Sequence, residues 1–127
     1  NVSGTLVAIK AMKKADCDRK NHMDAVTAER DILLRLGAHA FVVTMFEAFH
    51  SASNVFMVME YLPGGDLSCL LANLEALDEG SARFYTAEIV LALRYLHKHG
   101  IVHRDIKPDN VLVAANGHIK LTDFGLA

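Results

Sequence analysis

The sequence predicts an α+β fold with two lobes, and three observations support that prediction. Strand patterns dominate the residues before the breaker cluster Pro63-Gly64-Gly65, and helix patterns dominate the residues after it. Of the 127 residues, 52% are apolar and 22% are charged, which excludes an intrinsically disordered chain. Residues that break helices and strands are few, with eight glycines and two prolines, and no internal repeat or long linker interrupts the chain.

The first predicted element is a buried strand over residues 6–12, an apolar run that contains Lys10. A polar segment, residues 13–23, leads to a helix predicted over residues 24–36. One face of that helix recurs at steps of three and four residues, and Gly37 ends the helix. The residues on that face are Val26, Glu29, Leu33 and Leu36.

Two further strands are predicted over residues 42–49 and 54–61, joined by a serine-containing turn. After the break, Asp66 is the predicted N-cap of a short apolar helix and Asp78 that of a longer one, which Gly100 ends. Short strands close the chain. The apolar stripe of the longer helix consists of Tyr85, Ile89, Ala92, Leu93 and Leu96, and the closing strands are residues 101–102, 111–113 and 119–122.

The charge balance and the cysteines limit the possible function classes. Thirteen Lys and Arg against fifteen Asp and Glu give a net charge of −2, so there is no electrostatic basis for binding nucleic acid or an anionic membrane. Cys17 and Cys69 make neither a disulfide framework nor a metal cluster and are expected to be inert, which fits a reduced, intracellular setting. The apolar runs are too short to span a bilayer, and no signal peptide is visible.

Two charges stand in apolar surroundings. Lys10 interrupts the first strand, and Glu29 lies on the apolar face of the first predicted helix. Lys10 could lie at a sheet edge and extend to water, and Glu29 could lie at the margin of its stripe. A Lys10–Glu29 ion pair resolves both problems at once and is expected to leave ammonium donors free for phosphate oxygens.

The strongest chemical signal is the segment His103-Arg104-Asp105-Ile106-Lys107-Pro108-Asp109-Asn110. It gathers a carboxylate, a cation and an amide in one loop, and Asp123-Phe124-Gly125 follows the next hairpin. Alone, Asp-Phe-Gly is typical of a turn at a strand end. Lys10, Glu29, the loop and Asp123 in this order make coincidence negligible, and oxygen ligands of this kind suit Mg²⁺.

Val7-Ala8-Ile9-Lys10, the loop at residues 103–110 and Asp123-Phe124-Gly125 resemble the signature set of eukaryotic protein kinases along essentially the whole chain. Residues 28–33, 57–61, 63–67 and 117–126 point to the AGC group of Ser/Thr kinases. Within that group the chain is most similar to the microtubule-associated Ser/Thr kinases, Greatwall and the plant kinases named for incomplete root hair elongation. The resemblance implies a bilobal, partial kinase-like fold. Residues 1–62 would form part of the N-lobe with the hinge, and residues 63–127 part of the C-lobe through the catalytic loop to the start of the activation segment.

The resemblance also implies the reaction, which is transfer of the ATP γ-phosphate to Ser/Thr hydroxyls of proteins. Lys10 would contact the α- and β-phosphates, and Glu29 would hold Lys10 in the active position. Asp105 would accept the hydroxyl proton, and Lys107, in the position typical of Ser/Thr kinases, would neutralise charge on the transferred group. The Mg²⁺ ligands would be Asn110 and Asp123.

By the same resemblance, adenine would bind main-chain groups of the hinge Glu60-Tyr61-Leu62, where Leu62 supplies an N–H. Asp66 would bind the ribose, and Ala8 and Leu112 would sandwich the ring. Met59 would be the gatekeeper, although simple core packing explains Met59 and Leu112 equally well. A regulatory spine would comprise Leu33, Met45, His103 and Phe124, and Arg104 would await a phosphate on the activation loop.

The sequence departs from the kinase pattern in its flanks. No G-x-G-x-x-G loop precedes Lys10, no Ala-Pro-Glu motif follows Gly125, and Ala40 stands where many relatives carry Pro. We therefore interpret the chain as a central fragment that is inactive and poorly soluble alone. A pseudokinase or ATP-binding scaffold and a small-molecule phosphotransferase are the alternatives. Expected partners are a protein substrate and an upstream activating kinase, in the cytoplasm and in the nucleus.

Overall fold

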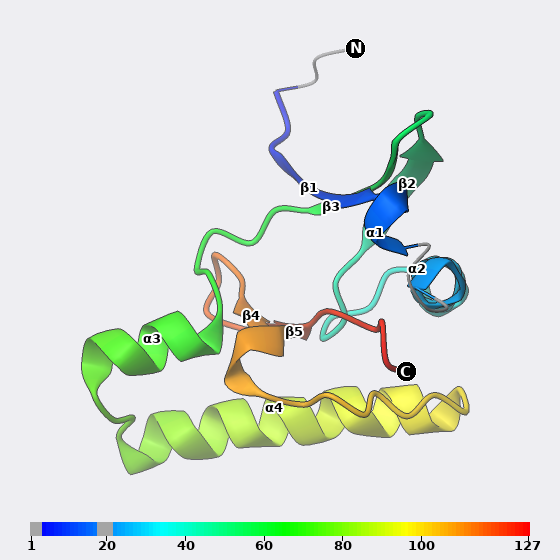
Figure 1. Ribbon diagram of the computed structural model, residues 1–127. Helices are drawn as coiled ribbons and strands as arrows, with labels where there is room; N and C mark the ends of the chain where they lie inside the picture. Colours follow the sequence, from blue (N-terminus) through cyan, green and yellow to red (C-terminus); the bar gives the residue numbers. More distant parts are fainter. Residues whose placement is uncertain (1–3, 18–21) are drawn as a thin grey trace.

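The structure, a computed structural model, describes residues 4–17 and 22–127. Figure 1 shows a β-sheet with a helix beside it in one part of the molecule, and two helices with a small hairpin in the other. Residues 61–66 lead from the first part to the second. This arrangement confirms the predicted α+β class.

The first part is an antiparallel sheet of three strands in the order β1-β3-β2, packed against helix α2. Along β1 the exposed fraction alternates, so that Ala8, Lys10 and Met12 share the less exposed face. In the register of β1 with β3, Lys10 lies opposite the fully buried Met57. The elements of this part are β1 (Val7–Lys13), α1 (Lys14–Cys17), α2 (His22–Leu36), β2 (Met45–His50) and β3 (Asn54–Glu60).

Helix α2 buries the face that its sequence predicts. Val26, Glu29, Leu33 and Leu36 are all at most 9% exposed. The helix ends as expected, because Gly37 takes a left-handed φ of 62° and donates its N–H to Leu33 O at 3.1 Å. The helix therefore presents one carboxylate, Glu29, from within an otherwise apolar face.

The second part consists of α3 (Leu67–Leu74), α4 (Glu79–Lys98), a 3₁₀ turn (Pro108–Asn110) and the hairpin of β4 (Val111–Val113) and β5 (Ile119–Leu121). Asp66 and Asp78 cap α3 and α4 as predicted, accepting N–H bonds from Cys69 at 2.8 Å and Ser81 at 3.0 Å. Ala92 and Leu96 of the predicted α4 stripe are fully buried. Among the described residues, no helix has both the length and the apolar content to cross a membrane.

Hydrogen bonds from backbone and side-chain groups join the two parts of the molecule. Leu121 of β5 donates its N–H to Phe41 O at 2.9 Å, and its carbonyl accepts the Val43 N–H at 3.0 Å. The Tyr95 hydroxyl on α4 donates to Leu36 O at the end of α2, at 2.8 Å. The position of α2 is thus tied to the hairpin and to α4.

Gly64 lies against β4 in a space that admits no side chain. Its N–H donates to Val113 O at 3.0 Å, and a Cβ at this position would lie 2.5 Å from the same oxygen. Residue 64, two positions after the hinge, therefore has to be glycine for this segment to approach β4.

Three predicted elements need correction. The strand predicted at residues 101–102 is wrong, because the Ile101 N–H donates to Leu96 O at the end of α4 and Val102 is 59% exposed. The strand predicted from residue 42 begins at Met45, since Val42 bridges to β5 instead of pairing with β3. The polar segment predicted at residues 13–23 contains α1 and the start of α2, and its residues 18–21 lie outside the described residues.

Candidate active site

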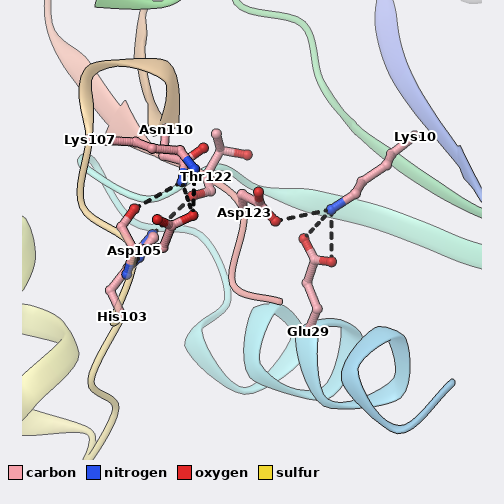
Figure 2. A network of polar contacts seen from close by, with 8 residues as sticks. All are labelled: Lys10, Glu29, His103, Asp105, Lys107, Asn110, Thr122 and Asp123. Atoms are coloured by element: carbon pink, nitrogen blue, oxygen red, sulfur yellow. Dashed lines mark hydrogen bonds and ion pairs between the residues drawn. The ribbon is translucent and has the colours of Figure 1, made fainter. Parts of the chain in front are cut away.

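Two carboxylates from distant parts of the chain hold the Lys10 ammonium (Figure 2). Its Nζ lies 2.9 Å from both oxygens of Glu29 and 3.3 Å from Oδ1 of Asp123. The Glu29 side chain is 4% exposed and that of Lys10 is 33% exposed. The predicted ion pair is confirmed, so neither charge extends freely into water.

The electrostatic surroundings of Lys10 favour its charged form. Burial by itself lowers the pKa of Lys10, but the hydrogen bonds and charges of Glu29, followed by those of Asp123, outweigh it and raise the pKa above its ordinary value. An ammonium has three donors, and these contacts use all of them. The expectation that the ion pair leaves donors free is therefore wrong for this arrangement.

His103 fixes the backbone of the loop at residues 103–110. It is 1% exposed; its Nδ1 accepts the Asp105 N–H at 3.3 Å, and its Nε2 lies 2.9 Å from Thr122 O. The first partner is a donor and the second is an acceptor, so the tautomer that fits both contacts has its N–H at Nε2. One side chain thus links Asp105 to the segment that precedes Asp123.

The backbone on either side of this link is unusual. Arg104 has a φ of 63° and Asp123 a φ of 61°, the left-handed region that residues other than glycine rarely adopt. Each conformation costs of order 1 kcal/mol or more, and such residues concentrate at functional sites. The two strained residues are thus Arg104, which precedes Asp105, and Asp123, which contacts Lys10.

Asp105 sits at the centre of a second network (Figure 2). Its Oδ2 accepts bonds from Lys107 Nζ at 2.8 Å and from Asn110 Nδ2 at 3.0 Å, and the same Asn110 group donates to Asp105 O at 2.9 Å. The Lys107 bond is the main reason that the pKa of Asp105 is lowered, and the Asp105 bond likewise raises the pKa of Lys107. Both side chains are therefore charged near neutral pH.

Asn110 and Asp123 fit the requirements of a magnesium site. Asn110 is 5% exposed and uses both amide hydrogens on Asp105, which leaves its Oδ1 as the ligand atom. Asp123 contacts Lys10 through Oδ1 and keeps Oδ2 for a metal. No group of three or more His, Cys, Asp and Glu with metal-binding geometry occurs in the described part of the chain, and Mg²⁺ characteristically takes few protein ligands with phosphate and water completing its shell.

A cavity of about 710 Å³ lies between these groups. Lys10, Glu29, Asp105 and Asp123 all line it, together with residues of β1 and the start of α2. The residues predicted to bind adenine are not part of this lining. The structure therefore brings Lys10, Asp105 and Asp123 together around one space. Lys107 and Asn110 do not line it and contact Asp105 instead.

Four of the residues predicted to surround the adenosine lie in two pairs. Ala8 and Met59 are opposite each other in the pairing of β1 with β3, and Leu112 forms an isolated bridge with Asp66. The Asp66 carboxylate caps α3 and also accepts the thiol of Cys69, which raises the pKa of that exposed thiol and fits an unreactive cysteine. The Cys17 side chain lies outside the part of the chain whose side chains the structure describes.

The hinge has a side-chain anchor. Glu60 Oε1 accepts the Thr44 N–H at 2.7 Å and the Lys120 ammonium at 2.6 Å. Leu62 is partly exposed, and Tyr61 is 50% exposed. The Glu60 side chain is therefore engaged within the protein, which is compatible with the prediction that a ligand at the hinge uses main-chain groups.

Comparison with known proteins agrees with this geometry. The model of the protein kinase domain family matches residues 1–127. The chain belongs to the protein kinase domain family. Over 125 residues, 98% of this chain, it is 57% identical to a probable serine/threonine protein kinase, IREH1, of Arabidopsis thaliana, of which it covers 10%.

Two other relatives of this kinase-domain chain come from different lineages. The chain is 52% identical to the serine/threonine-protein kinase greatwall of Homo sapiens and to the probable serine/threonine-protein kinase pkgA of Dictyostelium discoideum, in each case over 98% of its length. It covers 14% of the first protein and 9% of the second. The chain thus spans only a small part of the curated relatives it matches.

The four residues that the kinase resemblance assigns to the regulatory spine are all buried. Leu33, Met45 and Phe124 belong to one hydrophobic cluster, and the rings of His103 and Phe124 are 4.8 Å apart. Arg104 is exposed, and residues 4–17 and 22–127 contain no carboxylate bound to it. The expectation that Arg104 awaits an anion is compatible with this position and stays a prediction.

Sequence reasoning missed two charged anchors of this kinase-domain chain. Lys120 bonds to Glu60 and also contacts His39 O and Val42 O at 3.3 and 3.5 Å. Glu88 is 6% exposed on α4. Its spacing from Tyr85 and Ala92 places it on the predicted apolar stripe of the helix. A charge on an apolar helix face was the signal that identified Glu29, and the same signal was present for Glu88.

Proposed function

We propose that the protein containing this chain is a Ser/Thr protein kinase that transfers the γ-phosphate of ATP to protein hydroxyls. The observation that carries the proposal is the meeting of two networks at one cavity. Lys10, Glu29 and Asp123 form the first network, and Asp105, Lys107 and Asn110 form the second. Phosphoryl transfer depends chiefly on positioning and charge neutralisation, and these networks supply both.

The cations of the site would bind the polyanionic nucleotide. Lys10 would contact the α- and β-phosphates while Glu29 holds it, and Lys107 would neutralise charge on the phosphoryl group in transit. Mg²⁺ bound by Asn110 and Asp123 would neutralise the phosphates and align them. The adenine would use main-chain groups of residues 60–62, with Ala8 and Leu112 on its two faces, Met59 behind it and Asp66 at the ribose.

Asp105 would act on the substrate hydroxyl. Its Oδ2 is occupied by Lys107 and Asn110, which leaves Oδ1 to accept the hydroxyl hydrogen bond. Because its pKa is lowered, Asp105 is a weak base, and its main contribution would be to orient the hydroxyl and receive the proton late in a loose transition state.

The finer assignments belong to the same proposal. Residues 1–62 would be part of an N-lobe with its hinge, and residues 63–127 part of a C-lobe. Lys107 supports the Ser/Thr class of EC 2.7.11.1. Arg104 supports regulation by an upstream kinase, which would supply the phosphate that this side chain binds. A protein substrate and an intracellular location, cytoplasmic and nuclear, follow from this class of activity.

The decisive experiment is a phosphoryl-transfer assay on the full-length protein with Ser/Thr and Tyr peptides. We expect transfer to Ser/Thr only, and a loss of about 10²–10⁴ in kcat for Asp105→Asn. Lys10→Met should lose a comparable factor, whereas the exposed Lys98→Met on α4 is the matched control and should retain activity. Full activity in both site variants would sink the proposal.

The alternative function is a pseudokinase or ATP-binding scaffold. A full-length protein that binds nucleotide but transfers no phosphate to any peptide would favour it. The presence of Lys10, Asp105, Asn110 and Asp123 argues for catalysis instead. We also expect these 127 residues to be inactive in isolation, and measurable turnover by them would contradict that expectation.

A further inference from the structure

Glu88 is a buried carboxylate without a part in the proposed reaction. Among the described residues, the buried charged or polar side chains are those of Glu29, Glu88, His103 and Asn110. The other three belong to the candidate active site. Glu88 lies on α4 instead, and a carboxylate buried this deeply needs a structural or functional reason.

The Glu88 carboxylate holds two successive residues of the β4–β5 hairpin. Its Oε2 accepts the Ile119 N–H at 2.9 Å, and its Oε1 makes a short contact with His118 Nδ1. Ile119 is fully buried, so this carboxylate is the partner that satisfies its N–H. The His118 ring also lies 5.6 Å from the ring of Phe84 on the same helix. The closed end of the hairpin is therefore attached to α4.

The open end of the same hairpin carries the proposed metal ligands. Asn110 immediately precedes β4, and Asp123 follows β5 by two residues. The Thr122 N–H donates to Asn110 O at 3.1 Å and joins the two ends. The hairpin has three residue pairs, and so short a ribbon has little stability of its own. Its attachment to α4 thus contributes to the position of both ligands, together with the backbone bonds that Leu121 and Val113 make to other segments.

We propose that Glu88 is a positioning residue for the metal-binding pair Asn110 and Asp123. By fixing the hairpin against α4, its carboxylate would hold Asn110 and Asp123 in place at the open end of the hairpin. Groups that orient metal ligands typically change metal affinity by 10–100-fold when they are removed. This inference rests on the proposed function, because it takes Asn110 and Asp123 as ligands of Mg²⁺.

The test is the binding of Mn²⁺, as a paramagnetic substitute for Mg²⁺, to the full-length protein with ADP, followed by electron paramagnetic resonance. We expect Glu88→Ala to weaken Mn²⁺ binding about tenfold or more. Glu88→Gln keeps an oxygen for the Ile119 N–H and should restore most of the affinity. Glu79→Gln is the control, because its side chain on the same helix is 87% exposed and should not affect binding.

Affinity and site number separate the positioning role from a merely structural one. A loss of folded protein lowers the number of Mn²⁺ sites at unchanged Kd, whereas a displaced ligand pair raises the Kd of every site. A raised Kd at unchanged site number supports the proposal, and an unchanged Kd in Glu88→Ala overturns it.

Two further results have defined meanings. If Glu88→Ala does not fold, Glu88→Asp decides, because it keeps a carboxylate but shortens the side chain that reaches the Ile119 N–H. A raised Kd at unchanged site number then supports the proposal, and an unchanged Kd refutes it. If the unaltered protein binds no Mn²⁺ with ADP, the proposed function itself fails, and this inference fails with it.

Discussion

The exposure of Lys10 and Glu29 predicts an asymmetry between the two ways of breaking their ion pair. Lys10→Met leaves the Glu29 carboxylate, 4% exposed, without its ammonium. Glu29→Leu leaves the Lys10 ammonium, 33% exposed, still 3.3 Å from Asp123. The first variant therefore leaves a buried carboxylate without its ammonium partner. The second leaves a partly solvated ammonium that still contacts Asp123.

The magnitudes follow from the solvation of each orphaned charge. Stranding a buried charge costs about 3–5 kcal/mol. For Glu29→Leu, the loss of the charged bonds, about 1–3 kcal/mol, is largely offset by burial of the leucine, about 2 kcal/mol. Lys10→Met should therefore be the less stable variant by roughly 3–5 kcal/mol.

Pulse proteolysis in urea at pH 7.5, on the full-length protein, measures this difference for the segment containing the site. With m about 2 kcal/mol/M, the two midpoints should differ by about 1.5–2.5 M. The double variant Lys10→Met/Glu29→Leu should be at least as stable as the unaltered protein, because it replaces the pair by apolar side chains, and should still lack activity. Equal midpoints for the single variants, or a lower midpoint for Glu29→Leu, would refute this reasoning.

Three other predictions concern pH and packing. Lys107→Met should move the acid limb of the kcat/KM–pH profile to higher pH, because the Lys107 bond is what chiefly lowers the pKa of Asp105; an unmoved limb would contradict this. Gly64→Ala should cost about 1–3 kcal/mol in pulse proteolysis, since its Cβ would lie 2.5 Å from Val113 O, and wild-type stability would show that the approach is not needed. A raised pKa of Lys10 stabilises the fold fully below the unfolded-state pKa, and this contribution is lost as pH rises through the folded-state pKa. The unaltered protein should therefore lose stability more steeply than Lys10→Met in strongly alkaline solution, and parallel curves would exclude this linkage.

Much of the fold was predictable from the sequence because its signals are local. The 3.6-residue period of α2, the caps Asp66 and Asp78 and the stop at Gly37 each depend on neighbours within one turn of helix, and the structure confirms all of them. The strand predicted at residues 101–102 failed because a short apolar pair says nothing about whether a partner strand is in reach.

The site was predictable where a charge contradicted its surroundings. Glu29 stood out on an apolar face, and Lys10 stood out in an apolar strand. Lys120 gave no such signal, since it lies in an ordinary polar position of a short strand and acquires its partner Glu60 only in three dimensions. Nor could spacing reveal that the Lys10 donors are all in use, because that depends on the distance to Asp123.

The contact between Lys10 and Asp123 would make metal binding and nucleotide binding thermodynamically dependent on each other if the proposed function holds. An ammonium with all three donors engaged has to release one before it can bind a phosphate oxygen, and the contact to Asp123 is the longest of the three. A cation held by the Asp123 carboxylate would weaken its attraction for Lys10 and so would favour release of that donor. By linkage, each ligand would then tighten the binding of the other by the same factor, and the proposed site would favour the metal–nucleotide complex over either component alone.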